Sequence, residues 1–219
     1  MKYHPEAALL ESYVRGEISA VDGVTVTTHL ETCSSCRSMV ASLEEKEAQL
    51  IEAIDSEYDV AFDSMMGDIL ELPSLDVKIS EKKITSVQVN GKTFELPKSL
   101  SRFTKNMSEW RSYGGKVFSS TIDLGEAERV NLLYISEGVQ VPQHTHRGTE
   151  STLVLHGSFS DEDGEYHKGD FLVADGSVKH SPRTEKGQDC LCLTVLSEPM
   201  VFTQGVARVF NMFGHGMYP

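Results

Sequence analysis

The sequence lacks any run of 18 or more apolar residues, the length that a membrane-spanning helix needs, so we expect no transmembrane segment. Its start has no apolar signal core, and we therefore expect a cytoplasmic protein. Cysteine is scarce as well: the four cysteines form two close pairs, Cys33/Cys36 and Cys190/Cys192. In a reducing compartment such pairs are more often metal ligands or free thiols than disulfides.

Positive charge is also in short supply, because 20 Lys and Arg face 33 Asp and Glu, a net charge of −13. Residues 1–75 hold 4 basic against 15 acidic residues, a net of −11, whereas residues 76–219 hold 16 against 18, a net of −2. Direct nucleic-acid binding is therefore not expected, since it requires Lys and Arg to neutralise phosphates. The acidic segment is either a solvated surface or suits a basic protein partner.

The first 75 residues carry apolar side chains at helical spacing. A first helix over 7–14 ends at Gly16, Ser19 can cap a second helix that runs to His29, and Ser34 or Ser35 can start a third. A fourth, shorter helical segment covers 62–72 and stops at Pro73. We expect an all-α small helical bundle here.

From about residue 77 the pattern changes to short strand-like runs separated by turn residues. One of these runs leads into Asn90-Gly91, a strong hairpin signal. Many short strands with regular turns indicate a sandwich or a barrel. We therefore predict two domains, an all-α domain over 1–75 and an all-β domain over 76–219, with the boundary near Pro73 to Asp76.

The spacing His29-x3-Cys33-x2-Cys36 places a metal-binding set near one helix face, since positions i, i+4 and i+7 lie together. His4 is the only other histidine of the helical segment and the natural fourth ligand. Two thiolates and two imidazoles form the tetrahedral donor set that zinc prefers. The alternative is a thiol redox motif, although such a motif usually sits at a strand-to-helix turn.

This His4, His29, Cys33 and Cys36 pattern, in an acidic helical domain of this size, resembles the zinc-containing anti-sigma domain. The resemblance implies a small helical bundle that binds zinc through these four residues. It further implies that the bundle clamps an extracytoplasmic-function sigma factor and hides the surfaces with which that factor meets core RNA polymerase.

A second constellation carries Gly138, His144, His146, Glu150 and Gly157 at the spacing of the first cupin motif. His144 and His146 lie two apart on a strand, so both point to the same face, into a barrel. The resemblance implies a cupin, which is a jelly-roll barrel, with His144, His146 and Glu150 as metal ligands.

The second cupin motif is looser, because it keeps Gly169 and His180 but has Asp175, Ser177 and Thr184 at the usual Pro, Gly and Asn positions. These departures put the turn geometry in doubt rather than the ligand. Three imidazoles and one carboxylate suit zinc or another divalent transition metal, and the sequence does not choose among them. The alternative is a cupin that has lost its metal.

Cys190 and Cys192 lie in an apolar run, two apart, and so on one face of a strand. They are either small core residues or, if that face is the barrel interior, a redox-sensing pair near the metal.

A zinc anti-sigma domain followed by a cupin is the arrangement of the ChrR family of anti-sigma factors, and the chain resembles this family over nearly its whole length. The resemblance implies inhibition of a group IV sigma factor, and a cupin that senses a stress such as reactive oxygen species. The competing function is a dioxygenase-like cupin enzyme, which needs an open coordination position and a substrate-sized pocket. A third is a sensor that binds a small molecule in the cupin without turning it over.

Overall fold

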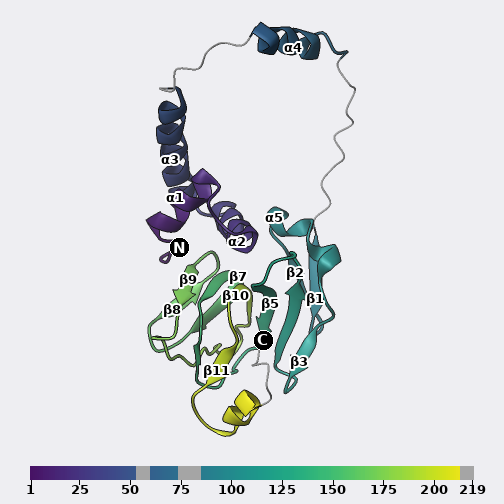
Figure 1. Cartoon of the computed structure of the whole chain (residues 1–219). Coiled ribbons are helices and arrows are strands. Elements are labelled where there is room, and N and C mark those ends of the chain that lie inside the picture. Colours follow the sequence, from purple (N-terminus) through teal and green to yellow (C-terminus); the bar gives the residue numbers. More distant parts are fainter. Residues whose placement is uncertain (53–59, 74–84, 213–219) are drawn as a thin grey trace.

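The computed structural model describes residues 1–52, 60–73 and 85–212 (Figure 1). Four helices come first: α1 (Ala7–Arg15), α2 (Ala20–Leu30), α3 (Ser34–Glu52) and α4 (Val60–Leu70). All four match the helices expected from the apolar spacing. The predicted domain boundary at 75/76 lies outside the described residues. No helix in the described part of the chain is long and apolar enough to cross a membrane.

Local sequence explains where the first helices start and stop. Gly16 follows α1 with φ 70°, a left-handed conformation that glycine adopts at little cost, and its amide donates to the carbonyl of Tyr13. The Ser19 hydroxyl accepts a hydrogen bond from the amide of Asp22 and so caps α2. A small core then joins the first three helices around buried Leu10, Val26, Cys33, Cys36 and Val40.

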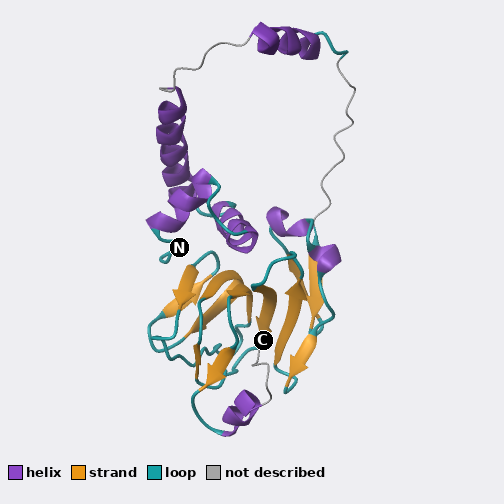
Figure 2. Ribbon diagram, in the orientation of Figure 1, coloured by secondary structure: helices purple, strands orange, loops and turns teal. Residues whose placement is uncertain are grey.

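The rest of the described chain is an antiparallel β domain with a few short helical turns (Figure 2). The strands and the short helices α5, η1 and η2 are β1 (Ser86–Val89), β2 (Lys92–Glu95), α5 (Lys98–Ser101), η1 (Thr104–Asn106), β3 (Arg111–Tyr113), β4 (Val117–Ile122), β5 (Arg129–Ile135), β6 (His144–His146), β7 (Glu150–Ser160), β8 (Glu165–His167), β9 (Phe171–Ala174), β10 (Cys190–Leu196), β11 (Met200–Phe202) and η2 (Val206–Met212). Asn90 and Gly91 join β1 to β2 with φ of 50° and 74°, as the hairpin signal predicted.

The main sheet has the order β3-β4-β5-β10-β7-β8, and β9 pairs with the first residues of β7 on the edge opposite β10. A second layer is the β6–β11 pair, which meets the loop of His180 through an isolated bridge between His144 and His180. The antiparallel architecture agrees with the predicted jelly roll, but the ladder of strands does not close into a barrel over the described residues. The loop that carries His180 forms single bridges instead of a strand, and this leaves the ladder open.

The helical part rests on one end of the β domain. Val21 of α2 is fully buried in the main core of the β domain, together with Leu132, Leu153 and Leu193. At the rim of this contact, the Glu31 carboxylate accepts hydrogen bonds from the amides of Lys98 and Ser99 at the start of α5. The two parts of the chain therefore share an interface that is apolar at its centre and polar at its edge.

Candidate metal centres

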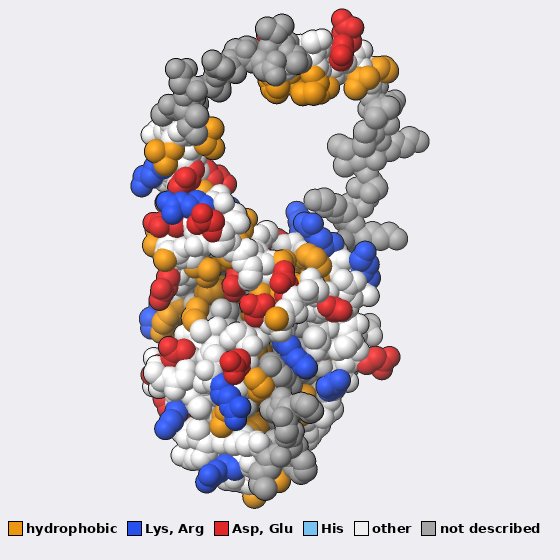
Figure 3. Space-filling model, viewed as in Figure 1, with side chains coloured by type: hydrophobic (Ala, Val, Ile, Leu, Met, Phe, Trp, Pro, Cys, Tyr) orange, Lys and Arg blue, Asp and Glu red, His pale blue; other side chains and the backbone are white. Residues whose placement is uncertain are grey.

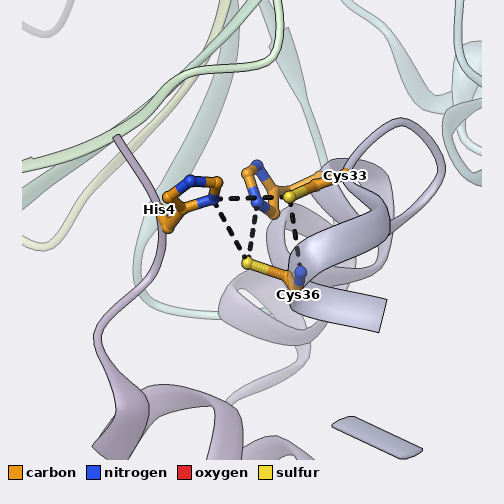
Figure 4. A group of neighbouring side chains, drawn as sticks. His4, Cys33 and Cys36 are labelled. Atoms are coloured by element: carbon orange, nitrogen blue, oxygen red, sulfur yellow. Dashed lines mark hydrogen bonds between the residues drawn. The ribbon is translucent and has the colours of Figure 1, made fainter. Parts of the chain in front are cut away.

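The first predicted site forms where three N-terminal segments meet. His4 precedes α1, His29 lies in the last turn of α2, and Cys33 and Cys36 flank the start of α3. The labelled side chains of His4, Cys33 and Cys36 point toward one another (Figure 4). His4 Nδ1 lies 3.3 Å from the Cys33 Sγ and 3.4 Å from the Cys36 Sγ, and His29 Nε2 lies 3.3 Å from the Cys36 Sγ.

These separations fit a tetrahedral zinc ion. Zinc bonds of about 2.0–2.3 Å place neighbouring ligand atoms about 3.3–3.8 Å apart, and all four candidate donor atoms lie within 4.8 Å of one another. The outer nitrogen of His29, Nδ1, is 2.9 Å from the carbonyl oxygen of Gly169. A carbonyl can only accept, so Nδ1 carries the proton and Nε2 presents its lone pair to the site.

Ionisation of the Cys36 thiol depends on a bound cation. Burial lowers the pKa of His29, which keeps the imidazole neutral. Burial and the adjoining Cys33 thiol raise the pKa of Cys36 to about 12, so without a cation the thiol keeps its proton. The residues present therefore fit a divalent ion such as zinc, which displaces such protons.

The second predicted site forms between β6, the start of β7 and the loop of His180. His144 and His146 both face inward from β6, and Glu150 is the first residue of β7. His146 Nε2 lies 3.2 Å from His180 Nε2 and 3.3 Å from Glu150 Oε2. The four ligand atoms lie within 4.8 Å of one another and all four residues are buried.

Outer hydrogen bonds fix the tautomers at this site too. The carbonyl oxygen of Pro142 lies 2.9 Å from His144 Nδ1, and the Asp161 carboxylate lies 3.0 Å from His180 Nδ1. Each contact leaves Nε2 of its ring to face the centre, which is the arrangement typical of histidine ligands.

The electrostatics keep two of the histidines neutral. Burial and the charge of His180 lower the pKa of His144 to about 4, and burial and the charge of His144 lower the pKa of His146 to about 3. Burial raises the pKa of Glu150 to about 7. Burial opposes the charging of His180, but the hydrogen bond to Asp161 and the charge of Glu150 outweigh it and raise that pKa. Neutral imidazoles beside a carboxylate suit a divalent transition metal.

A cavity of about 660 Å³ opens onto this second site. Its walls are largely apolar and come from both layers of the β domain, among them Val117, Ile135, Phe159 and Phe202, while His144, Glu150 and His180 form its polar end. Thr194 of β10 also lines it, and its buried hydroxyl has no hydrogen-bond partner among the described residues. Such a lone buried hydroxyl is costly.

The second cysteine pair lies beside the same cavity. Cys190 and Cys192 are both buried on β10 with their sulfurs 3.4 Å apart, and Cys192 is one of the cavity-lining residues. The contact with Cys190 and burial raise the pKa of Cys192. Both alternatives left open by the sequence are therefore met in part: the two thiols are buried, Cys192 lines the cavity at the second site, and its thiol is held in the protonated form. Their redox role stays a prediction.

The turn residues that depart from the second cupin motif are structurally accounted for. The Asp175 carboxylate accepts hydrogen bonds from both the amide and the hydroxyl of Ser177. The Thr184 hydroxyl donates to the carbonyl of Ser136 and accepts from the amide of Val139. Gly157 is a position where only glycine fits, because a Cβ there would collide with the carbonyl of Asp189.

All eight ligands proposed from the sequence thus fall into the two groups expected, four in each. Sequence reasoning missed the groups that hold the ligands from outside, namely the Asp161 carboxylate and the carbonyls of Pro142 and Gly169, and it missed Thr194. The signal Asp161-Glu162-Asp163-Gly164 indicates a turn but not its contact with His180, which lies 19 residues away.

Comparison with known proteins supports the two-part reading. A family model described as the ChrR cupin-like domain matches residues 104–199, and one described as a putative zinc-finger matches residues 7–37. The protein named anti-sigma-E factor ChrR of Cereibacter sphaeroides is 30% identical over 97% of this chain and 98% of its own. The crystal structure of Rhodobacter sphaeroides SigE in complex with the anti-sigma ChrR contains a similar chain, with 29% identity, a TM-score of 0.69, and coverage of 89% of this chain and 98% of that one.

Proposed function

Because the chain belongs to the ChrR family of anti-sigma factors, we propose that its helical part binds an extracytoplasmic-function sigma factor and keeps it from directing transcription. The family is regulatory, so the prediction of a non-enzyme is confirmed and the dioxygenase-like alternative is set aside. The related ChrR has been crystallised with SigE.

The observation that carries the proposal is the apolar face of α4, which packs against no other element among residues 1–52, 60–73 and 85–212. Phe62, Met65, Met66 and Ile69 follow one another at helical spacing and are all exposed, Phe62 by 53% and Ile69 by 51%. Figure 3 shows their apolar atoms gathered along one side of that helix. Large exposed apolar faces mark interaction sites, and flexible methionines suit a protein-binding surface.

Charge supports the same kind of partner. Residues 1–75 carry a net charge of −11, and an acidic surface speeds and orients the docking of a basic one. A factor that must contact DNA and RNA presents such basic surfaces. The apolar face of α4 supplies the binding affinity, and the surrounding Asp and Glu make binding specific for a basic partner.

The first metal site has a structural task in this proposal. His4, His29, Cys33 and Cys36 bind Zn²⁺ and tie the N-terminal segment, the end of α2 and the start of α3 to one another. The core of this bundle is small, with Leu10, Val26 and Val40 as its buried aliphatic residues. In such a bundle the free energy of metal binding becomes free energy of folding.

The second metal site has the sensing task. His144, His146, Glu150 and His180 bind Zn²⁺ or another divalent metal at the end of the cavity. The cavity is of the size that binds small molecules, and the lone Thr194 hydroxyl gives such a molecule a polar anchor. An oxidant or a small oxidised molecule that reaches this site, beside Cys190 and Cys192, alters the affinity for the sigma factor. This is where we place the response to reactive oxygen species.

The test is a calorimetric titration of the full-length chain, loaded with zinc, against its sigma factor, together with a transcription assay. We expect binding, inhibition of transcription, and a loss of affinity of about 10- to 100-fold in Ile69→Asp. Val206→Asp is the matched control, because Val206 is 90% exposed but lies on η2 of the β domain. Absence of binding, or equal losses in both variants, would overturn the proposal.

A further inference from the structure

One stretch of the β domain, residues 161–171, reaches both metal sites. It supplies Asp161, whose carboxylate holds the outer nitrogen of His180, and Gly169, whose carbonyl holds the outer nitrogen of His29. We propose that Asp161, Tyr166 and Tyr3 form a link through which metal occupancy of the second site controls how firmly His4 is held in the first. This inference rests on the proposed regulatory function, and it names the route that the regulation takes.

The first half of the link is a hydrogen-bonded chain inside the β domain. The two oxygens of Asp161 are shared: Oδ2 lies 3.0 Å from His180 Nδ1, and Oδ1 accepts the Tyr166 hydroxyl at 3.1 Å. The amides of Asp163 and Gly164 also donate to Oδ1, so this buried carboxylate sits in a fixed turn. A metal on His180 Nε2 orients the imidazole, and that orientation sets the position of Asp161 and of the Tyr166 hydroxyl.

The second half carries the same turn to the N-terminus. The ring centroids of Tyr166 and Tyr3 lie 4.9 Å apart. The Tyr3 hydroxyl packs on Gly164, where an added Cβ would lie only 2.7 Å from its oxygen. Tyr3 is therefore seated on the turn that Asp161 organises, and the next residue along the chain is His4.

The backbone at Tyr3 is held by the same stretch of residues 161–171. Its amide donates to the Asp170 carboxylate and its carbonyl accepts from the amide of Phe171, at 3.2 and 3.1 Å. Asp170 is buried and also accepts from the amides of Lys2 and His167. Figure 1 shows this end of the chain beside β8 and β9.

Residues 161–171 therefore contact the ligands of both sites from outside. If the second site loses its metal, His180 is free to reorient, Asp161 and Tyr166 lose a fixed partner, and the seat of Tyr3 loosens. His4 is the one exposed ligand of the first site, so it is the ligand that this loosening affects most. Its departure exposes Cys33 and Cys36 and weakens the bundle that binds the sigma factor.

The experiment uses the full-length chain with zinc and without any sigma factor. The second site is impaired with Glu150→Gln, which touches no residue of the link, and metal content is measured directly. The readout is the rate at which iodoacetamide labels Cys33 and Cys36, resolved by peptide mass mapping so that Cys190 and Cys192 do not contribute. We expect labelling at least about 5-fold faster in Glu150→Gln than in the unmodified chain.

The decisive variant is Tyr166→Phe, which keeps the ring but removes the hydroxyl that binds Asp161. In this background the ratio of rates with and without Glu150→Gln falls toward 1. Tyr134→Phe is the matched control, because the buried Tyr134 hydroxyl donates to a carboxylate, that of Asp189, outside both sites. In that background the ratio stays as in the unmodified chain. Tyr3→Ala provides a second break in the link if Tyr166→Phe does not fold.

The link would be overturned if Glu150→Gln alone did not speed labelling, so that the ratio of rates stayed near 1. It would also be overturned if Tyr166→Phe and Tyr3→Ala both left that ratio unchanged. Sigma-factor affinity is measured separately on the same variants. A labelling ratio near 1 in chains that keep Tyr3 and Tyr166, together with intact sigma binding, refutes only the link. Failure of sigma binding with an intact ratio refutes only the anti-sigma function.

Discussion

The two candidate metal centres differ in what surrounds them. The first has four protein donors, two of them thiols, and lies between helices with His4 exposed. The second has no thiol among its donors, all four donor residues are buried, and it faces a cavity of about 660 Å³. A tetrahedral centre with two thiolates among its four protein donors is typical of a structural role, whereas one that adjoins a cavity has room for an incoming ligand.

Protonation separates the two centres as clearly as shape does. At the first, Cys36 must lose a proton whose pKa is raised to about 12. At the second, His144 and His146 are neutral, with pKa values lowered to about 4 and about 3, and Glu150 has a pKa raised to about 7. We therefore expect a metal at the first centre to displace a thiol proton, whereas at the second it meets two imidazoles that are already neutral.

The sharpest test of this contrast is Cys36→Ser. We expect the chain to lose one bound metal, the helical part to unfold, and sigma binding to disappear, because a structural zinc supplies about 10–16 kcal/mol. The β domain keeps its metal. Metal analysis and circular dichroism measure these outcomes, with Cys190→Ser as a control that removes a buried thiol outside both ligand sets. A folded helical part in a Cys36→Ser chain that has lost one of its two metals would contradict the structural role.

The next largest effect is expected on metal affinity at the second centre, when the carboxylate that supports His180 is replaced. Asp161→Asn replaces the carboxylate that accepts from His180 and is expected to weaken metal binding at the second centre by about 10- to 100-fold. Competition with a chelator measures this loss. Asp163→Asn is the control, since Asp163 contributes only its amide to that turn. Equal affinities in the two variants would mean that Asp161 does not support His180.

The pH dependence of metal affinity should differ between the centres. From pH 8 to 7 the affinity of the first falls about tenfold for the Cys36 proton alone, because that thiol binds its proton throughout this range. The second stays nearly constant until the pH falls to about 7, where Glu150 begins to take up its proton, and His180, with its raised pKa, adds to the loss. Chelator competition on Glu150→Gln and Cys36→Ser chains separates the two curves. Parallel curves would contradict the assignment of donors.

The smallest effect concerns the cavity wall. Thr194→Val removes a buried hydroxyl without a partner and is expected to stabilise the ligand-free chain by about 1 kcal/mol. That gain raises Tm by about 2–4 °C. Thr25→Val is the matched control: the buried Thr25 hydroxyl donates to the Val21 carbonyl, so its removal brings no gain. A lower Tm for Thr194→Val would mean that this hydroxyl is already satisfied.

The ligands could be predicted from the sequence because their spacing is local. His29, Cys33 and Cys36 lie within two helical turns, and His144 and His146 lie on one short strand. Helix ends were predictable for the same reason, since Gly16 and Ser19 act on their neighbours.

What the sequence did not predict depends on contacts between distant segments. Asp170 binds the amide of Tyr3 across 167 positions, and neither residue carries a pattern that points to the other. The open strand ladder could not be predicted either, because the motif around His180 indicates a ligand but not that its loop forms only single bridges. The cavity depends on how both layers pack, which spacing along one strand does not encode.

The seating of Lys2 and Tyr3 on Asp170 has a consequence for protein engineering. The first residues of the chain belong structurally to the β domain, although they precede the helices. A chimera that joins the helices of one family member to the β domain of another should therefore carry residues 1–3 from the donor of the β domain. Joined at a single crossover between the domains, such a hybrid would pair a foreign N-terminus with the carboxylate that must receive it.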